Sequence, residues 1–181
     1  ISAQTFFGSE PSAHTYSIAA RDPETGEMGV AVQSHWFSVG SIVAWGEAGV
    51  GVVATQSFVN PSFGQRGLEL LKTGKTAQEV VDQLIESDDG RDVRQLAIED
   101  SKGNSAGYTG AKCISEAGHF VGNNYSVQAN MMLKNTVWNA MSKAFESTQG
   151  PLAERLISAL EAAQNEGGDI RGKQSASLLI V

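Results

Sequence analysis

The stretch that most constrains the fold is residues 14–34, where two strand-like segments flank a short polar turn. In the first segment apolar residues alternate with small or polar ones, and the second contains a β-branched run at residues 29–32. A period of two is typical of β-strands. Between the segments, Asp22, Pro23 and Gly26 supply a side-chain acceptor, a fixed φ and tolerance of positive φ. The sequence therefore predicts a β-hairpin that other strands extend into a sheet.

The rest of the chain continues as strands, two helices, strands, two helices and a final strand. Further strands are predicted at residues 41–44, 49–57, 94–99, 105–109, 119–121, 125–132 and 175–181. Helix pairs are predicted near residues 61–87 and 136–166, where apolar residues recur with helical spacing behind capping residues such as Thr76. These elements fit an α+β fold, a four-layer αββα sandwich with mainly antiparallel sheets and the helices outside.

The composition is that of one acidic domain. The chain has 181 residues and 41% hydrophobic content, which is enough for a single core. Its net charge of −7 opposes binding to nucleic acid or to an anionic membrane surface, so neither partner is expected. The most apolar stretch, residues 41–54, is interrupted by Glu47 and is too short for a membrane helix. We expect residues 1–14 to be an N-terminal arm or leader and residues 15–181 to be a single domain.

The sequence contains no signature of a cofactor or metal site in the structural context that such a site requires. Residues 49–54 fit the pattern GxGxxA, but they lie in strand-like sequence and do not open a helix, as a dinucleotide site requires. Acidic residues at 86–92 are spread around a predicted helix end, which indicates a solvated surface. The sequence contains no HExxH, CxxC or P-loop motif, and its single cysteine, Cys113, can form no internal disulfide. We expect neither a cofactor nor a metal ion.

Thr15, at the head of the first strand, is the candidate nucleophile. A threonine in this position matters chemically only if the chain is cut in front of it, because its own α-amine can then act as a base toward its hydroxyl. The alternative is that Thr15 is an ordinary β-branched strand residue.

Several long segments resemble, in the same order, the bacterial family called domain of unknown function 1028. They are TYSIAARDPETGEMGVAVQSHWFSVGS, AGVGVVATQSFVNPSFGQRGLELL, YSVQANMM, GPLAERLISALEAAQ and GGDIRGKQSASLLIV, and the match runs from Thr15 to Val181. That family is grouped with the N-terminal-nucleophile (Ntn) hydrolases, typically amidohydrolases with an αββα fold. The resemblance implies cleavage of a C–N bond in a small or linear amide, with Thr15 as nucleophile. Some relatives carry export signals, so a periplasmic or extracellular location is favoured over the cytoplasm, although the compartment stays open.

The matched motifs also supply supporting residues for such a site. Ser34 ends the strand that pairs with the strand opened by Thr15, so the two hydroxyls should meet. Asn130 lies on the polar face of a strand, from which its amide could donate to a developing oxyanion. Asp169 and Arg171 form a charged pair on a glycine-flanked loop. This pair suits the orientation of an amine or the binding of a carboxylate, or it is a salt bridge that stabilises the loop.

Two other functions stay open. One is a non-catalytic Ntn-fold binding or oligomeric assembly protein, in which exposed aromatics such as Trp36 and Phe37 form an interface, unless these are core residues. The other is a hydrolase that pairs His35 or His119 with a serine, which requires a histidine within about 3 Å of that hydroxyl. In the leading hypothesis His35 belongs to the substrate-binding group. We expect a homo-oligomer, because Ntn folds often pack through their helix layers.

Overall fold

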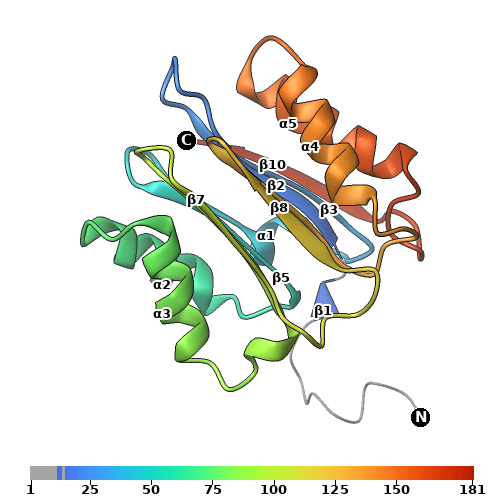
Figure 1. Cartoon of the computed structure of the whole chain (residues 1–181), viewed down its shortest axis with the longest axis horizontal. Helices are drawn as coiled ribbons and strands as arrows, with labels where there is room; N and C mark the ends of the chain where they lie inside the picture. The colour runs from blue at the N-terminus through green and yellow to red at the C-terminus, as the bar shows by residue number, and fades with distance from the viewer. Residues whose placement is uncertain (1–11, 14) are drawn as a thin grey trace.

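The computed structural model describes residues 12–13 and 15–181, with only the backbone described for residues 12 and 13 (Figure 1). Within these residues the strands form two five-stranded antiparallel sheets. Sheet A contains β1 (Ser12–Ala13), β4 (Ala44–Glu47), β5 (Gly51–Phe58), β6 (Arg94–Asp100) and β7 (Ser105–Thr109). Sheet B contains β2 (Thr15–Arg21), β3 (Met28–Ser34), β8 (Gly118–Gly122), β9 (Tyr125–Ala129) and β10 (Ser175–Ile180).

The two sheets lie face to face, and each carries two helices on its other side (Figure 1). Helices α2 (Ser62–Lys72) and α3 (Ala77–Glu86) pack on sheet A, whereas α4 (Val137–Ser147) and α5 (Leu152–Asn165) pack on sheet B. A four-residue helix, α1 (Gly40–Val43), and a 3₁₀ turn, η2 (Arg91–Val93), complete the described elements. The predicted mixed α+β fold with antiparallel sheets is confirmed.

The hairpin of β2 and β3 has the register that its sequence predicts. Thr15 pairs with Ser34 at one end and Arg21 with Met28 at the other. In the order β10-β3-β2-β9-β8, β2 is the central strand of sheet B. Tyr16, Ile18 and Ala20 pack against the helices α4 and α5, so the alternate residues Thr15, Ser17 and Ala19 face sheet A.

Helix starts follow the capping residues in the sequence. Thr76 accepts a hydrogen bond from the Glu79 backbone amide, and the Glu79 side chain accepts one from the Thr76 amide, which completes the predicted capping box of α3. At the start of α2, Asn60 accepts from the Ser62 amide at 3.2 Å. These side chains satisfy backbone donors that the first helical turn leaves without partners.

The prediction of a strand at residues 41–44 is wrong, because residues 40–43 form α1. The amides of Ile42 and Val43 both bond to the Val39 carbonyl, and the strand β4 begins only at Ala44. Four residues are too few for either period to show, and β-branched residues alone favoured a strand. Nearby, Phe37 is 85% exposed and is therefore not a core residue, whereas Trp36 is half-buried.

Most of the segment that formally fits a dinucleotide motif lies in a strand, as expected, and its first two residues, Gly49 and Val50, belong to the turn before that strand. Gly51 opens the fully buried β5, and a Cβ atom there would lie 2.5 Å from the Glu99 carbonyl oxygen. The glycine therefore permits close packing between strands. No helix in the described part of the chain is long and apolar enough to cross a membrane.

The end of the predicted N-terminal arm takes part in sheet A. Ser12 and Ala13 form β1 and pair with Phe58 and Ser57 of β5. The remainder of that predicted arm lies outside the described residues. Because Thr15 already belongs to sheet B, the chain passes from one sheet to the other between Ala13 and Thr15.

Candidate active site at the start of β2

The space between the sheets is apolar in one part and polar near Thr15. The apolar part is built by Ala19, Met28, Val30, Val32, Val52, Ala54 and Ala97, with Val39 and Val43. The polar part is a layer of fully buried side chains, Thr15, Ser17, Ser34, Gln56, Gln95, Ser126, Gln128 and Asn130. Buried polar groups carry a desolvation cost unless they are hydrogen-bonded, so this layer must be a connected network.

The hydroxyls of Thr15 and Ser34 meet within this layer. Thr15 Oγ1 donates to Ser34 Oγ at 3.2 Å, a contact that follows directly from the pairing of the two residues across β2 and β3. Thr15 is completely buried. Its hydroxyl therefore has a fixed neighbour and no contact with solvent in this form of the chain.

Two amide side chains hold the backbone of Thr15. The Thr15 carbonyl accepts from Asn130 N at 3.0 Å, from Gln56 Nε2 at 3.2 Å and from Asn130 Nδ2 at 3.4 Å. Gln95 Oε1 in turn accepts from Gln56 Nε2 at 2.7 Å and from Asn130 Nδ2 at 2.9 Å. These shared acceptors fix which end of each amide carries the nitrogen.

One acceptor in this network has no partner. Among the described residues, Asn130 Oδ1 is buried and makes no hydrogen bond, although the rest of the side chain is fully engaged. Native proteins rarely leave such an atom unpaired, and each case needs an explanation. The atom lies on the residue that binds the Thr15 carbonyl, so a donor placed beside Thr15 is the natural partner.

Asp169 and Arg171 form a second group beside the first. Arg171 donates to both carboxylate oxygens, from Nε to Oδ1 at 3.0 Å and from its terminal nitrogen to Oδ2 at 2.6 Å. The backbone amide of His35, which follows Ser34, also donates to Asp169 at 3.4 Å. Asp169 is further bridged to Met132 after β9. The loop thus joins the end of β3, which carries Ser34, to the segment directly after β9, which carries Asn130.

Burial and the Asp169 charge raise the pKa of the neighbouring Tyr16 hydroxyl, burial being the larger cause. Tyr16 donates to Gln164 Oε1 at 3.0 Å and stays protonated throughout the physiological range. It is therefore a donor here and not a base.

The sequence hypothesis placed these residues in one site, and the structure brings them together in two linked groups. Thr15, Ser34 and Asn130 are joined directly by hydrogen bonds. His35, Asp169 and Arg171 meet this group at the junction of residues 34 and 35, with His35 contributing its backbone amide. What each residue does chemically stays a prediction.

Gln56 and Gln95 were missed by sequence reasoning, although both contact the site. Gln56 is the one amide side chain of β5, Gln95 is the one amide side chain of β6, and both reach the opposite sheet. A long polar side chain within each predicted strand was the available signal.

His119 does not form the histidine and serine pair that was predicted as an alternative, because its neighbour is a threonine. Its Nδ1 lies 2.8 Å from the hydroxyl of Thr109, and that hydroxyl also accepts from Gln95 Nε2 at 2.9 Å. Burial lowers the pKa of His119, so its ring is neutral at pH 7. Among the described residues, no group of three or more His, Cys, Asp and Glu side chains could hold a metal ion.

The chain belongs to the DUF1028 family, which is described as a family of unknown function. The model of this family matches residues 15–181. It is similar to the crystal structure of protein SPO2555 from Silicibacter pomeroyi, a protein of the same family. That similarity has a TM-score of 0.87 and 33% sequence identity, and covers 94% of this chain and 74% of the other. No curated protein matches the chain.

Proposed function

We propose that this protein is an Ntn-type amidohydrolase in which Thr15 becomes the nucleophile once its α-amine is free. The observation that carries the proposal is the position of Thr15, first in the central strand of sheet B, with a hydroxyl neighbour and two amides fixing its backbone. The arrangement of two facing sheets between helix pairs supports the four-layer αββα fold of that class.

The proposed reaction needs the α-amine as its base. A threonine hydroxyl is a weak nucleophile near neutral pH, and the nitrogen of Thr15 is an amide while residue 14 is attached. After cleavage, the free amine takes the hydroxyl proton as Oγ1 attacks the substrate carbonyl carbon. The C–N bond then breaks, the leaving amine takes that proton, and an ester to Thr15 remains. Water hydrolyses this ester by the same base and regenerates the free threonine.

Ser34 and Asn130 take supporting roles in this scheme. Ser34 orients the Thr15 hydroxyl, which it already contacts. Asn130 Oδ1, without a partner among the described residues, accepts from the newly formed α-amine. Both hydrogens of Asn130 Nδ2 have acceptors in the present form, so donation to the oxyanion, as the sequence suggested, requires a rearrangement after cleavage.

In the uncleaved chain, β1 lies shortly before Thr15 and pairs with β5. Ala13 is paired to Ser57 in sheet A, and Thr15 to Ser34 in sheet B, so the intervening peptide connects the two sheets at this end. Removal of residues 1–14 frees both the α-amine and the edge of β5 at Ser57 and Phe58. We infer that cleavage creates the base and opens access in one step.

The experiment is an intact-mass measurement of the protein from its native host, followed by amidase screening. We expect a mass corresponding to a chain that begins at Thr15, and hydrolysis by that form but not by its Thr15→Ala variant. If the alanine variant or the uncleaved chain hydrolyses equally well, Thr15 is not the nucleophile. The non-catalytic binding or assembly function would then be preferred.

A further inference from the structure

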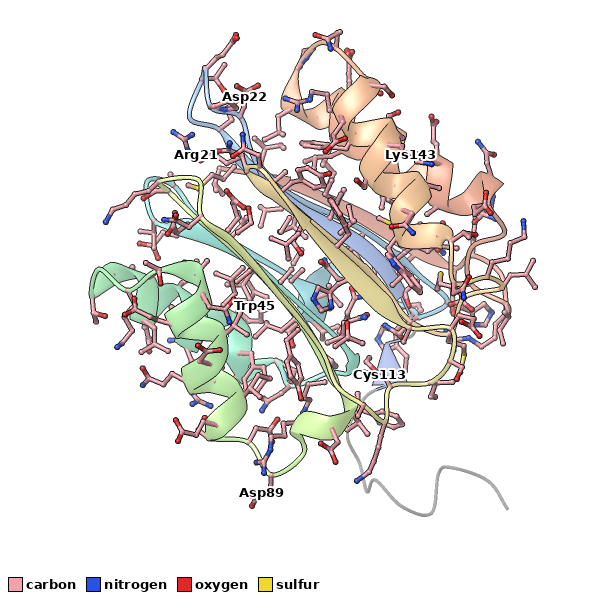
Figure 2. The ribbon with its side chains drawn as sticks, in the orientation of Figure 1. Arg21, Asp22, Trp45, Asp89, Cys113 and Lys143 are labelled. Carbon is pink, nitrogen blue, oxygen red and sulfur yellow. The ribbon has the colours of Figure 1, made fainter. Side chains whose placement is uncertain are left out.

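A cavity of about 520 Å³ lies beside the Thr15 site, between the loop that joins β7 to β8 and the start of α4. Its functional side chains are Thr109, Cys113, Ser115, Glu116, His119 and Trp138. The label of Cys113 in Figure 2 shows at which end of the two sheets the cavity lies. The strand β1 lies at the same end (Figure 1). A volume of this size is typical of sites for small organic molecules.

Gln95 links this cavity to the hydrogen-bond network that holds Thr15. Gln95 Nε2 donates to the cavity-lining Thr109 hydroxyl at 2.9 Å and to the Gly118 carbonyl at 3.1 Å. Its Oε1 accepts from the two amides that hold the Thr15 carbonyl. The loop itself is bonded to the strand end after Asn130, since Met131 N donates to the Ile114 carbonyl at 3.0 Å. The cavity is therefore built into the same network as the candidate nucleophile.

The charge of the cavity wall is negative. Glu116 is the single Asp, Glu, Lys or Arg among its lining residues. The other titratable groups in the wall are neutral at pH 7, because burial lowers the pKa of His119 and raises the pKa of the Cys113 thiol. Within the described residues, the Glu116 side chain forms no hydrogen bond or ion pair. Its carboxylate is available to a ligand.

An indole forms the adjoining part of the wall. Trp138 at the start of α4 packs so closely on β8 that a Cβ atom at Gly118 would lie 2.5 Å from its ring. Glycine at residue 118 therefore allows the ring to lie against the strand. An indole face attracts organic cations, and a carboxylate that lines the same cavity adds to that preference.

We propose that this cavity binds the ammonium group of a small organic amine, with Glu116 as its counter-ion and Trp138 as the aromatic wall. The extension to catalysis rests on the proposed function: in the cleaved enzyme the substrate is an amide whose acyl part carries a positive charge. Binding of the amine itself requires no hydrolysis, so the two claims are tested separately.

Isothermal titration of the full chain with three compounds of similar shape tests the binding site. Tyramine carries an ammonium group, 4-ethylphenol is uncharged, and 4-hydroxyphenylacetate is anionic. We expect tyramine to bind at least about tenfold more tightly than either of the others, as one charge-assisted contact implies. Absence of saturable tyramine binding, or equal binding of the three, overturns the proposal.

Two substitutions identify the groups responsible. Glu116→Gln keeps the shape of the side chain and removes its charge, so tyramine binding should weaken about tenfold. Glu161→Gln also removes one negative charge, from an exposed position on α5, and should leave tyramine binding unchanged. The Trp138→Phe variant should bind tyramine more tightly than the Trp138→Leu variant does. Unchanged binding by the Glu116→Gln variant contradicts the assignment.

The substrate claim is tested on the cleaved form with three p-nitroanilides, those of 6-aminohexanoic, hexanoic and adipic acid. Preference for the 6-aminohexanoyl compound, lost in the Glu116→Gln variant, supports the claim. Hydrolysis without such a preference refutes the substrate class and leaves the Thr15 mechanism standing. Selective tyramine binding with no hydrolysis of any amide supports the cavity and refutes the mechanism.

Discussion

Gln95 connects the side chains around Thr15 to those around Thr109. Its carbonyl oxygen binds the amides of Gln56 and Asn130, and its nitrogen donates to Thr109 and to the carbonyls of Gly118 and Ala129. The side chain is fully buried, so no water can replace these contacts without entering the space between the sheets.

The substitution Gln95→Ala should therefore lower the free energy of unfolding by about 3 kcal/mol, because it leaves several buried donors and acceptors without partners. Urea denaturation followed by tryptophan fluorescence measures this change. The control is Gln78→Ala, since Gln78 is an exposed amide on α3 whose side chain donates to Asp82; this substitution should cost less than about 0.5 kcal/mol. Equal effects of the two substitutions would show that the network does not stabilise the fold.

Glu99 is a buried carboxyl group near the end of the sheets opposite Thr15. Burial, the largest cause, raises its pKa to about 8, although Ser105 donates a hydrogen bond to one oxygen. The other oxygen has no hydrogen-bond partner among the described residues. The protonated form is thus the one that the folded state favours.

Because the pKa of Glu99 is higher in the folded state than in the unfolded chain, its charge costs stability as the pH rises. The cost is absent below the unfolded pKa of about 4.3, grows up to pH 8 and is constant above that value. Glu99→Gln should accordingly gain stability relative to the parent chain between pH 5 and pH 8, by up to about 3 kcal/mol. Urea denaturation across this range is the measurement, with the exposed Glu86→Gln as control. A pH-independent difference would contradict a raised pKa.

At the scale of elements, α2 is seated on sheet A through a close contact with β4. A Cβ atom at Gly64 of α2 would lie 2.1 Å from the Trp45 ring, and Trp45 Nε1 donates to the Ile42 carbonyl at 3.2 Å. Figure 2 shows Trp45 in the region where the green helices meet the sheet. The glycine thus sets how closely this helix approaches the strand.

Gly64→Ala should force these elements apart and lower the free energy of unfolding by about 2 kcal/mol, a typical cost of overpacking. The fluorescence of Trp45 should also change in the folded state, because its environment is altered. Gln65→Ala, at the next position along α2, changes an exposed side chain and should have little effect on either quantity. An unaltered stability of the Gly64 variant would mean that the ring moves aside without cost.

For the whole molecule, local signals in the sequence predicted most elements but not how the site is held. The hairpin at residues 15–34 and the capping box of α3 depend on neighbouring residues, so their patterns are visible in sequence. Contacts such as Gln56 with the Thr15 carbonyl, or Gln95 with the Ala129 carbonyl, join residues that belong to different sheets. They depend on how the sheets stack, and no local period encodes that. The helix α1 was missed because it is too short to show a helical period.

The central claim is that the α-amine of Thr15 is the catalytic base. Two chains that differ by one residue test it most directly: one begins at Thr15, and the other begins at His14 and so keeps the Thr15 nitrogen as an amide. The measurement is kcat/KM of both chains for the same p-nitroanilide as a function of pH. We predict a rate about 1,000-fold higher for the chain that begins at Thr15, rising with pH through the α-amine pKa of about 7.7–8.0. Equal rates for the two chains would contradict the mechanism.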